Sequence, residues 1–245
     1  MNPISVKPYY QAGNATIYHG DCRAIMPEMV TDSVDLIVAD PPYDGLKGGV
    51  EFATSAKSVA DVKQRSVTVG SPWLSDLDWV HEAWRIARLG MMVFCSHHNA
   101  PEVASMLPRE SRVALVTWYK RNAPPCVANV PRFMTEFIWL FKKRPGLDWK
   151  ALPSTMLDVP NANPGCMTTE RFVDGSGKAV HPCQKPLSVL LFLLAVGGES
   201  ILDPFMGTGT ALRAAKDLRR GAIGIETEQR YCDLAVSRLS QEVLL

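Results

Sequence analysis

The six cysteines of this sequence form no CxxC pair, and their spacing from histidines fits no zinc motif. A structural zinc site needs four ligands placed together, so we predict no metal site. Unpaired cysteines without a secretion signal favour a reducing compartment, and we expect a cytoplasmic protein. The longest largely apolar run, residues 187–196, is too short to cross a bilayer, so we expect no membrane segment.

The chain also lacks a large net charge. Its formal charge is +1 over 245 residues, which does not mark a nucleic-acid-binding protein. Residues 118–186, however, hold ten basic side chains against five acidic ones. The basic ones are Lys120, Arg121, Arg132, Lys142, Lys143, Arg144, Lys150, Arg171, Lys178 and Lys185. Two interpretations stay open, a solvated face or an electrostatic footprint for a polyanion.

The length fits one domain over residues 1–245, and a hydrophobic content of 47% allows a substantial core. Short β-branched or aromatic runs predict strands at residues 15–19, 34–39, 91–95, 113–118, 136–141, 200–202 and 222–225. Helical patterns lie at residues 79–87, 186–196, 211–220 and 231–239, the second ending at Gly197-Gly198 and the third at Gly221. Strands alternating with helices indicate an α/β fold with a mostly parallel central sheet.

Two segments do not follow this pattern. Residues 44–72 and 146–180 are irregular and rich in glycine, with little apolar periodicity. Loops of this length inside a compact domain are usually functional or disordered. Because residues 44–72 bury little apolar surface, we expect them to be a mobile loop that orders over a bound substrate.

Asp40-Pro41-Pro42-Tyr43 directly follows the predicted strand at residues 34–39. Ligands of open α/β sheets bind at the carboxyl ends of the strands. The carboxylate of Asp40 and the backbone carbonyl of Pro41 can accept the two N–H bonds of an exocyclic amine on a nucleobase. The prolines stiffen this turn, and Tyr43 offers an aromatic face to a base removed from its stack. An ordinary Asp-Pro corner is the alternative.

A second turn runs from Asp203 to Thr210 after the predicted strand at residues 200–202. Gly207 and Gly209 permit positive φ and a close approach of backbone to ligand. Glu226 ends the next predicted strand, where a partner for ribose hydroxyls is expected. No Gly-Lys-Ser/Thr follows, so the turn is not a P-loop. A nucleoside-like cofactor is therefore predicted.

The alternative for this turn is a dinucleotide-dependent oxidoreductase. It is disfavoured because Leu212 stands where the dinucleotide fingerprint has its third glycine. Just before the turn lies His181-Pro182-Cys183-Gln184-Lys185-Pro186. Lys185 could meet a cofactor carboxylate there, unless the segment is only a proline-bounded linker.

In this order the motifs resemble those of the β-class DNA amino-methyltransferases, which use S-adenosylmethionine. That family runs from DPPY through a target-recognition region to HPxQKP and FxGxG, and the chain follows this order over most of its length. Further matches are Gly20-Asp21, Trp118, Lys120 and Asn122 followed by Glu136, and the tail from Gly224 through Tyr231 to Arg238. Met206 departs from the family's more usual aromatic or small residue.

The resemblance implies a Rossmann-like methyltransferase fold in which the catalytic half precedes the cofactor half. It implies a target-recognition region at about residues 119–180. The target base would be handled by Asp40, Pro41, Pro42 and Tyr43. The residues around S-adenosylmethionine would be Asp21, Lys185, Asp203, Phe205, Gly207, Gly209 and Glu226.

The implied activity is site-specific methyl transfer to N6 of a flipped adenine in double-stranded DNA. Cytosine-N4 methylation is an alternative, although the family associates DPPY mainly with adenine and SPPY with cytosine. A non-catalytic nucleic-acid-binding protein of the same fold is another. Pro125-Cys126 resembles the nucleophile of cytosine-C5 methyltransferases, but the partner motif and the motif order of that class are missing.

The partner implied is double-stranded DNA, and the oligomeric state stays open, with a homodimer among the alternatives. We expect the basic surplus of residues 118–186 and the loop at residues 44–72 to form the recognition face. On this hypothesis Lys142, Lys143 and Arg144 would touch backbone phosphates.

Overall fold

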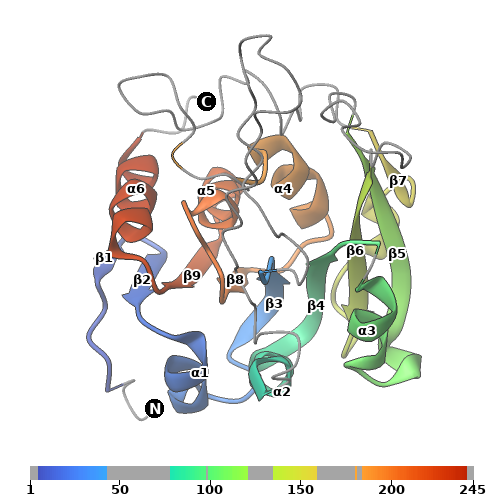
Figure 1. Cartoon of the computed structure of the whole chain (residues 1–245), viewed down its shortest axis with the longest axis horizontal. Coiled ribbons are helices and arrows are strands. Elements are labelled where there is room, and N and C mark those ends of the chain that lie inside the picture. Colours follow the sequence, from blue (N-terminus) through green and yellow to red (C-terminus); the bar gives the residue numbers. More distant parts are fainter. Residues whose placement is uncertain are drawn as a thin grey trace, which may run out of the picture.

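The computed structural model describes residues 5–42, 78–97, 99–120, 135–158, 180 and 184–241, and the description below is of these residues. They contain one nine-stranded sheet in the order β1-β2-β9-β8-β3-β4-β6-β5-β7 (Figure 1). The strands are β1 Tyr10–Ala12, β2 Ala15–His19, β3 Val34–Ala39, β4 Ala87–Cys95, β5 Arg112–Tyr119, β6 Thr135–Lys142, β7 Met156–Leu157, β8 Ser200–Asp203 and β9 Gly221–Glu226.

Helices cover both faces of the sheet, and each face has its own hydrophobic cluster. One face carries α4 Leu187–Leu194, α5 Thr210–Asp217 and α6 Gln229–Ser240. The other carries α1 Cys22–Ile25, α2 Asp78–Ile86 and α3 Ala100–Ser105. Three 3₁₀ turns complete the described elements: η1 Met26–Glu28, η3 Arg109–Ser111 and η4 Trp149–Ala151.

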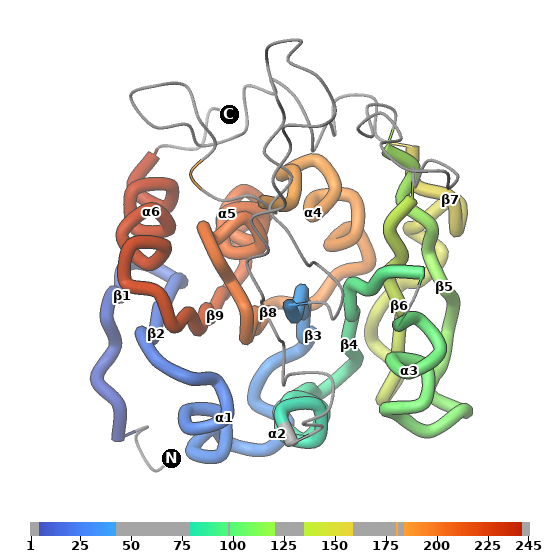
Figure 2. Tube along the Cα trace, in the orientation of Figure 1, coloured from blue at the N-terminus to red at the C-terminus, as the bar shows by residue number. Residues whose placement is uncertain are grey.

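Strand direction determines where the site forms. β1 and β6 run opposite to the other strands, so the sheet is mostly parallel. β3 is buried at every position because both of its faces are covered, and this explains its nearly continuous apolar run. The tube in Figure 2 shows the N-terminal β2 beside the late elements β9 and α6, so the two ends of the chain build one side of the sheet together.

The predicted α/β fold with a mostly parallel sheet is confirmed, and every predicted strand and helix is present. The largest shift is the start of β4, which begins at Ala87 and not at residue 91. The sequence did not predict β1, β7, α1 or α3. One helix end was wrong. α5 ends at Asp217, four residues before Gly221, and the chain turns at Arg219 with φ +60° while Gly221 opens β9.

Gly209 sits at the N-cap of α5 with φ +75°, and a Cβ there would lie 2.8 Å from Cβ of Ala235 in α6. We predict that Gly209→Ala lowers the free energy of unfolding by more than the roughly 1–2 kcal/mol that left-handed backbone costs an L-residue. Gly13→Ala is the matched control, because Gly13 has φ +54° and open space around it. Urea unfolding should rank the Gly209 variant below the Gly13 variant, and equal losses would contradict the packing argument.

Candidate functional site

The predicted site residues lie at the carboxyl edge of the sheet. Asp203 and Glu226 end β8 and β9, while Asp40 and Asp21 follow β3 and β2. These four strands are parallel and adjacent in the order β2-β9-β8-β3, so their carboxyl ends meet at one edge. This edge is where an open α/β sheet binds its ligands.

The turn after β8 is tied to the end of β9. The backbone N–H of Phe205 donates to Oδ1 of Asp203 at 3.0 Å, and that of Gly207 donates to Oε2 of Glu226 at 2.9 Å. Oε1 of Glu226 accepts from the N–H of Glu228 at 2.8 Å. Gly207, with φ +50°, lies within this turn. The carboxylate of Glu226 therefore fixes the glycine turn as well as ending its own strand.

Met206 and Phe205 pack in opposite directions from this turn. The thioether of Met206 fills the space that a Cβ of Gly224 would occupy, and Met206 is 4% exposed. The departure from the family's usual residue is thus accommodated by a glycine in β9. The ring of Phe205 meets Trp79 of α2 edge to face, with centroids 5.0 Å apart. The turn is therefore anchored by Met206 packed on Gly224 and by Phe205 packed on Trp79.

Asp21 caps α1, and its side chain accepts from the N–H of Arg23 at 2.8 Å. The Arg23 guanidinium also bonds to it, with Nη2 at 2.7 Å from Oδ2. Hydrogen bonds from Arg23 lower the pKa of Asp21 in spite of partial burial. Asp21 is therefore a carboxylate beside the end of β2, as its predicted role requires.

Asp40 forms an ion pair with Lys185, whose Nζ lies 2.6 Å from Oδ2. Lys185 precedes α4, so it comes from a segment far along the chain. It was predicted as a cofactor contact, yet it forms an ion pair with the acid of the first motif. Nζ of Lys185 also lies 3.5 Å from Oε2 of Glu136, at the start of β6. The sequence pointed to Glu136 only through the family pattern and gave it no place in the site.

Burial raises the pKa of Asp203 to about 8. The N–H of Phe205 opposes this shift, while the negative charges of Asp40 and Glu226 add to it. Relative to the ordinary value of 3.8, the folded protein holds this proton more tightly than the unfolded chain does. The stability that this bound proton contributes is present in full below pH 3.8 and is lost as the pH rises from there through about 8.

We therefore predict that Asp203→Asn, which keeps an oxygen for Phe205, becomes increasingly more stable than the wild type between about pH 4 and pH 8. Above that range the difference should level off. Urea unfolding of the cofactor-free protein across pH measures it. Glu102→Gln, at an exposed carboxylate of α3, is the control for the loss of a carboxyl group outside the site. A flat profile for Asp203→Asn would contradict the assigned protonation.

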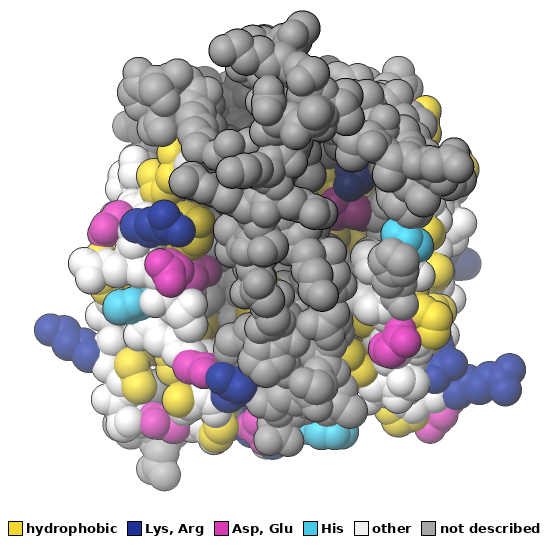
Figure 3. Space-filling model, viewed as in Figure 1, with side chains coloured by type: hydrophobic (Ala, Val, Ile, Leu, Met, Phe, Trp, Pro, Cys, Tyr) yellow, Lys and Arg dark blue, Asp and Glu magenta, His cyan; other side chains and the backbone are white. Residues whose placement is uncertain are grey.

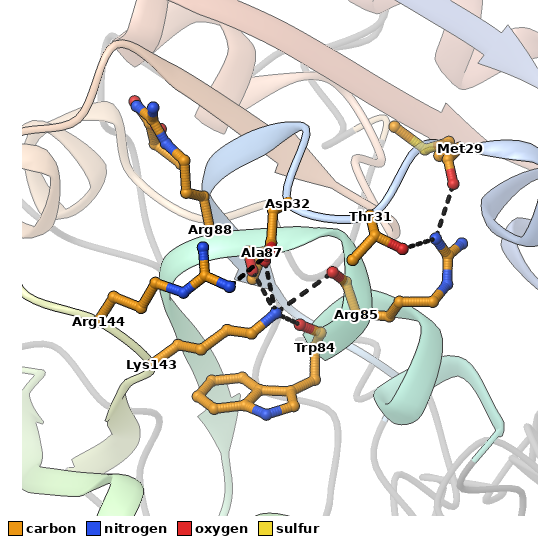
Figure 4. Close-up of polar contacts among 10 residues, drawn as sticks. Met29, Thr31, Asp32, Trp84, Arg85, Ala87, Arg88, Lys143 and Arg144 are labelled. Atoms are coloured by element: carbon orange, nitrogen blue, oxygen red, sulfur yellow. Dashed lines mark hydrogen bonds and ion pairs between the residues drawn. The ribbon is translucent and has the colours of Figure 1, made fainter. Parts of the chain in front are cut away.

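The hypothesis that Lys142, Lys143 and Arg144 lie on the recognition face is not supported. β6 runs antiparallel to β4, so these residues leave the sheet at the edge opposite Asp40. Nζ of Lys143 donates to Asp32 at 2.8 Å and to the carbonyls of Trp84 and Ala87, and Arg144 pairs with the same Asp32 (Figure 4). The contacts of Lys143 hold together the starts of β3 and β4.

The charges visible on the described surface are mixed. On the face shown in Figure 3, basic and acidic side chains lie interspersed around the residues that are not described. Several predicted segments lie outside the described part of the chain: Tyr43, residues 44–72, residues 121–134 with Pro125-Cys126, residues 159–179 and His181-Pro182-Cys183. The predictions made for them stay predictions.

Cys22, Cys95 and Cys232 are buried free thiols, and burial raises the pKa of each to about 12. In the part of the chain that the structure describes, no group of three or more His, Cys, Asp or Glu side chains is placed to hold a metal ion. Within the same residues, none of the helices has the length and apolar character needed to cross a membrane.

Two relatives match almost the whole chain. The type II methyltransferase M2.LlaDCHI of Lactococcus lactis subsp. cremoris is 30% identical over 262 residues, covering 97% of this chain and 94% of the relative. M2.DpnII of Streptococcus pneumoniae, also a type II methyltransferase, is 30% identical over 258 residues, covering 98% of this chain and 94% of the relative.

Solved structures share the fold. The M1.HpyAVI–SAM complex has a TM-score of 0.62 and 24% identity, covering 93% of this chain and all (100%) of that one. The cytosine-N4-specific PvuII DNA methyltransferase has a TM-score of 0.69 and 16% identity, covering 99% of this chain and 92% of that one. At these identities the likeness establishes the Rossmann-like methyltransferase fold alone.

The family model of the N6/N4 DNA methylases matches residues 34–237. The match spans the Asp40 motif, Lys185, the glycine turn and Glu226. Together with the full-length relatives, it shows that the chain belongs to the family of DNA amino-methyltransferases.

Proposed function

We propose that this DNA methyltransferase transfers a methyl group from S-adenosylmethionine to N6 of an adenine flipped out of double-stranded DNA. One observation carries the proposal. β3 and β8 are neighbours, so Asp40 and the glycine turn of Phe205, Gly207 and Gly209 follow adjacent strand ends. An acceptor for an amine and a cradle for a nucleoside therefore stand side by side.

The charges at this edge suit the proposed cofactor. Asp21, Asp40, Asp203 and Glu226 are four carboxyl groups on adjacent strands, and Asp40 and Glu226 raise the pKa of Asp203 by their negative charge. A ligand with a cationic sulfur and a cationic ammonium reduces this repulsion. A dianionic phosphate ligand would increase it, which disfavours a dinucleotide here.

S-adenosylmethionine, when bound, supplies a methyl group activated by its positively charged sulfur. On this proposal Glu226 accepts the ribose hydroxyls while still holding the N–H of Gly207. Asp203, Phe205, Gly207 and Gly209 line the nucleoside, and Asp21 and Lys185 complete the cofactor site. Lys185 can serve there from its bond to Asp40, because an ammonium has three donors.

Asp40 and the carbonyl of Pro41 would each accept one N–H of the target amine. This draws the nitrogen lone pair out of conjugation with the ring and aims it at the methyl carbon. An ionised carboxylate has about four acceptor positions, so Asp40 can keep Lys185 and still bind the amine. Pro42 restrains the turn and Tyr43 stacks on the base. The protein's main contribution is to position two reactants in a dry pocket.

The finer features follow from the same proposal. We assign residues 1–245 to one methyltransferase domain with target recognition in residues 119–180. The enzyme would be cytoplasmic and DNA-associated and act on duplex DNA, with a homodimer as one of its alternative oligomeric states. Lys120 is the described basic residue of this region closest in sequence to residues 121–134, and it lies on the catalytic edge, unlike Lys142.

Methyl transfer tests the proposal. Purified protein is incubated with unmethylated duplex DNA and S-adenosylmethionine labelled on its methyl group, and label in the DNA is counted. We expect that incorporation of label depends on DNA and reaches a plateau as the incubation with the enzyme continues. DNA binding without incorporation would instead support a non-catalytic nucleic-acid-binding protein of this fold.

A further inference from the structure

Four charged side chains of alternating sign form a continuous row at the carboxyl edge. Nζ of Lys120 lies 2.6 Å from Oε1 of Glu136. Nζ of Lys185 lies 3.5 Å from Oε2 of the same glutamate and 2.6 Å from Oδ2 of Asp40. The row runs from the end of β5 through the start of β6 to the residue after β3. Glu136 therefore shares Lys185 with the proposed amine acceptor.

The row is poorly solvated. Lys185 is 10% exposed and Glu136 is 19% exposed, and the lysine ammonium groups lie over aromatic rings, Lys185 over Phe94 and Lys120 over Trp118. Burial alone raises the pKa of Glu136, but the charges of Lys185 and Lys120 outweigh it and leave the pKa lowered. A buried charge that loses its partner is costly, so the members of the row depend on one another.

Glu136 is also placed to connect two parts of the protein. Its register partner in β5 is Trp118, and Lys120 follows two residues later, so the ion pair joins the two strands that flank residues 121–134. Its other oxygen, Oε2, is buried and accepts no hydrogen bond, and Lys185 is the cation beside it. One oxygen thus pairs with Lys120 at the end of β5, and the other faces Lys185, the partner of Asp40.

We propose that Glu136 is a positioning residue for Asp40 and acts through Lys185. The Glu136 carboxylate holds the Lys185 ammonium between two anions, and Lys185 in turn fixes the carboxylate of Asp40 for the target amine. The inference rests on the proposed function, since it assigns Asp40 to the amine. Without the charge of Glu136, Lys185 would lose one of the two carboxylates that flank it in the row, and Lys120 would lose its ion-pair partner.

Glu136→Gln tests this role, because the amide keeps the size of the side chain and removes its charge. We expect kcat to fall by about 10-fold, since a small misplacement of a reacting group slows transfer strongly. The dissociation constant for S-adenosylmethionine should stay within about 2-fold, because the proposed cofactor contacts other than Lys185 lie at the ends of β2, β8 and β9, which β3 and β4 separate from β6. Glu102→Gln, an exposed carboxylate in α3, is the matched control and should leave both constants unchanged.

A double-mutant cycle with Lys185→Met separates positioning from general structural damage. If Glu136 acts through Lys185, the double variant should be no slower than Lys185→Met alone. The inference would be overturned if the kcat losses of the two single variants multiplied in the double variant, or if Glu136→Gln had a normal kcat. Should Glu136→Gln unfold more readily, Glu136→Asp keeps the charge, withdraws it from Lys185 and should show the same selective loss of kcat. A wild type without methyl transfer would refute the proposed function itself, which is a distinct outcome.

Discussion

Asp40→Ala should abolish methyl transfer while the protein still binds S-adenosylmethionine. Removing a preorganised polar group that stabilises the transition state typically costs ~100-fold or more in rate. The proposed cofactor site lies mainly on the ends of β8 and β9 and on the glycine turn, whereas Asp40 follows β3, so cofactor binding should survive. Transfer of labelled methyl groups gives the rate, and calorimetry gives the dissociation constant. Near-normal activity of this variant would remove Asp40 from the reaction.

Two further variants sharpen this test. Glu102→Ala removes an exposed carboxylate from α3, outside the proposed recognition region, and should leave transfer unchanged. Asp40→Asn keeps one oxygen acceptor but puts an amide donor beside Lys185, where the carboxylate now accepts at 2.6 Å. We expect it to be nearly as slow as Asp40→Ala, because the charge that holds Lys185 is gone.

Glu226→Ala should weaken binding of S-adenosylmethionine by about 1.5–3 kcal/mol if the carboxylate accepts charged hydrogen bonds from the ribose. Part of the loss would come from the protein itself, because the N–H groups of Gly207 and Glu228 lose their acceptor. Calorimetry measures the dissociation constant directly. An unchanged constant would remove Glu226 from the cofactor site.

Glu226→Gln divides these two contributions. The amide oxygen can still accept from the N–H of Gly207, but the charge is lost. Binding weaker than in the wild type yet stronger than in Glu226→Ala would assign one share to the ribose and the other to the turn. Glu228→Ala, an exposed neighbour, serves as the control and should bind normally.

The sequence predicted the sheet well where both faces are buried. β3 is buried at every position and was predicted with its observed bounds, because burial requires apolar side chains along the strand. β2, buried at three of its five positions, was also predicted with its observed bounds. β1 was missed because it is a short, exposed edge strand, although Gly13-Asn14 is a two-residue hairpin signal. β7 has two residues and depends on pairing with β5, which leaves no periodicity to read.

The end of α5 was misplaced for a tertiary reason. Glycine is the expected residue for left-handed backbone, so Gly221 was the natural stop. In the structure Arg219 takes the left-handed conformation instead. The guanidinium of Arg220 bonds to the carbonyls of Leu194 and Gly197 at the end of α4, which fixes this turn. These bonds span 26 and 23 residues, so the local sequence around Gly221 carries no signal for them.

The candidate site was predictable in its motifs but not in its pairings. Strand ends and glycine spacing placed Asp40, Asp203 and Glu226 at one edge. The pairing of Lys185 with Asp40 spans 145 residues, and local spacing carries no signal for it. The charge count was misleading for residues 142–144, because a surplus in sequence does not tell which edge of the sheet an antiparallel strand reaches.

The central claim is that this chain methylates adenine N6 by means of Asp40. The most direct test is chemical analysis of nucleosides from the DNA of cells that express the protein, in a host without its own DNA methylation, with Asp40→Ala expressed in parallel. The account predicts N6-methyladenine at one recognition sequence with the wild type and none with the variant. N4-methylcytosine with the wild type, or N6-methyladenine at equal levels with the variant, would contradict it.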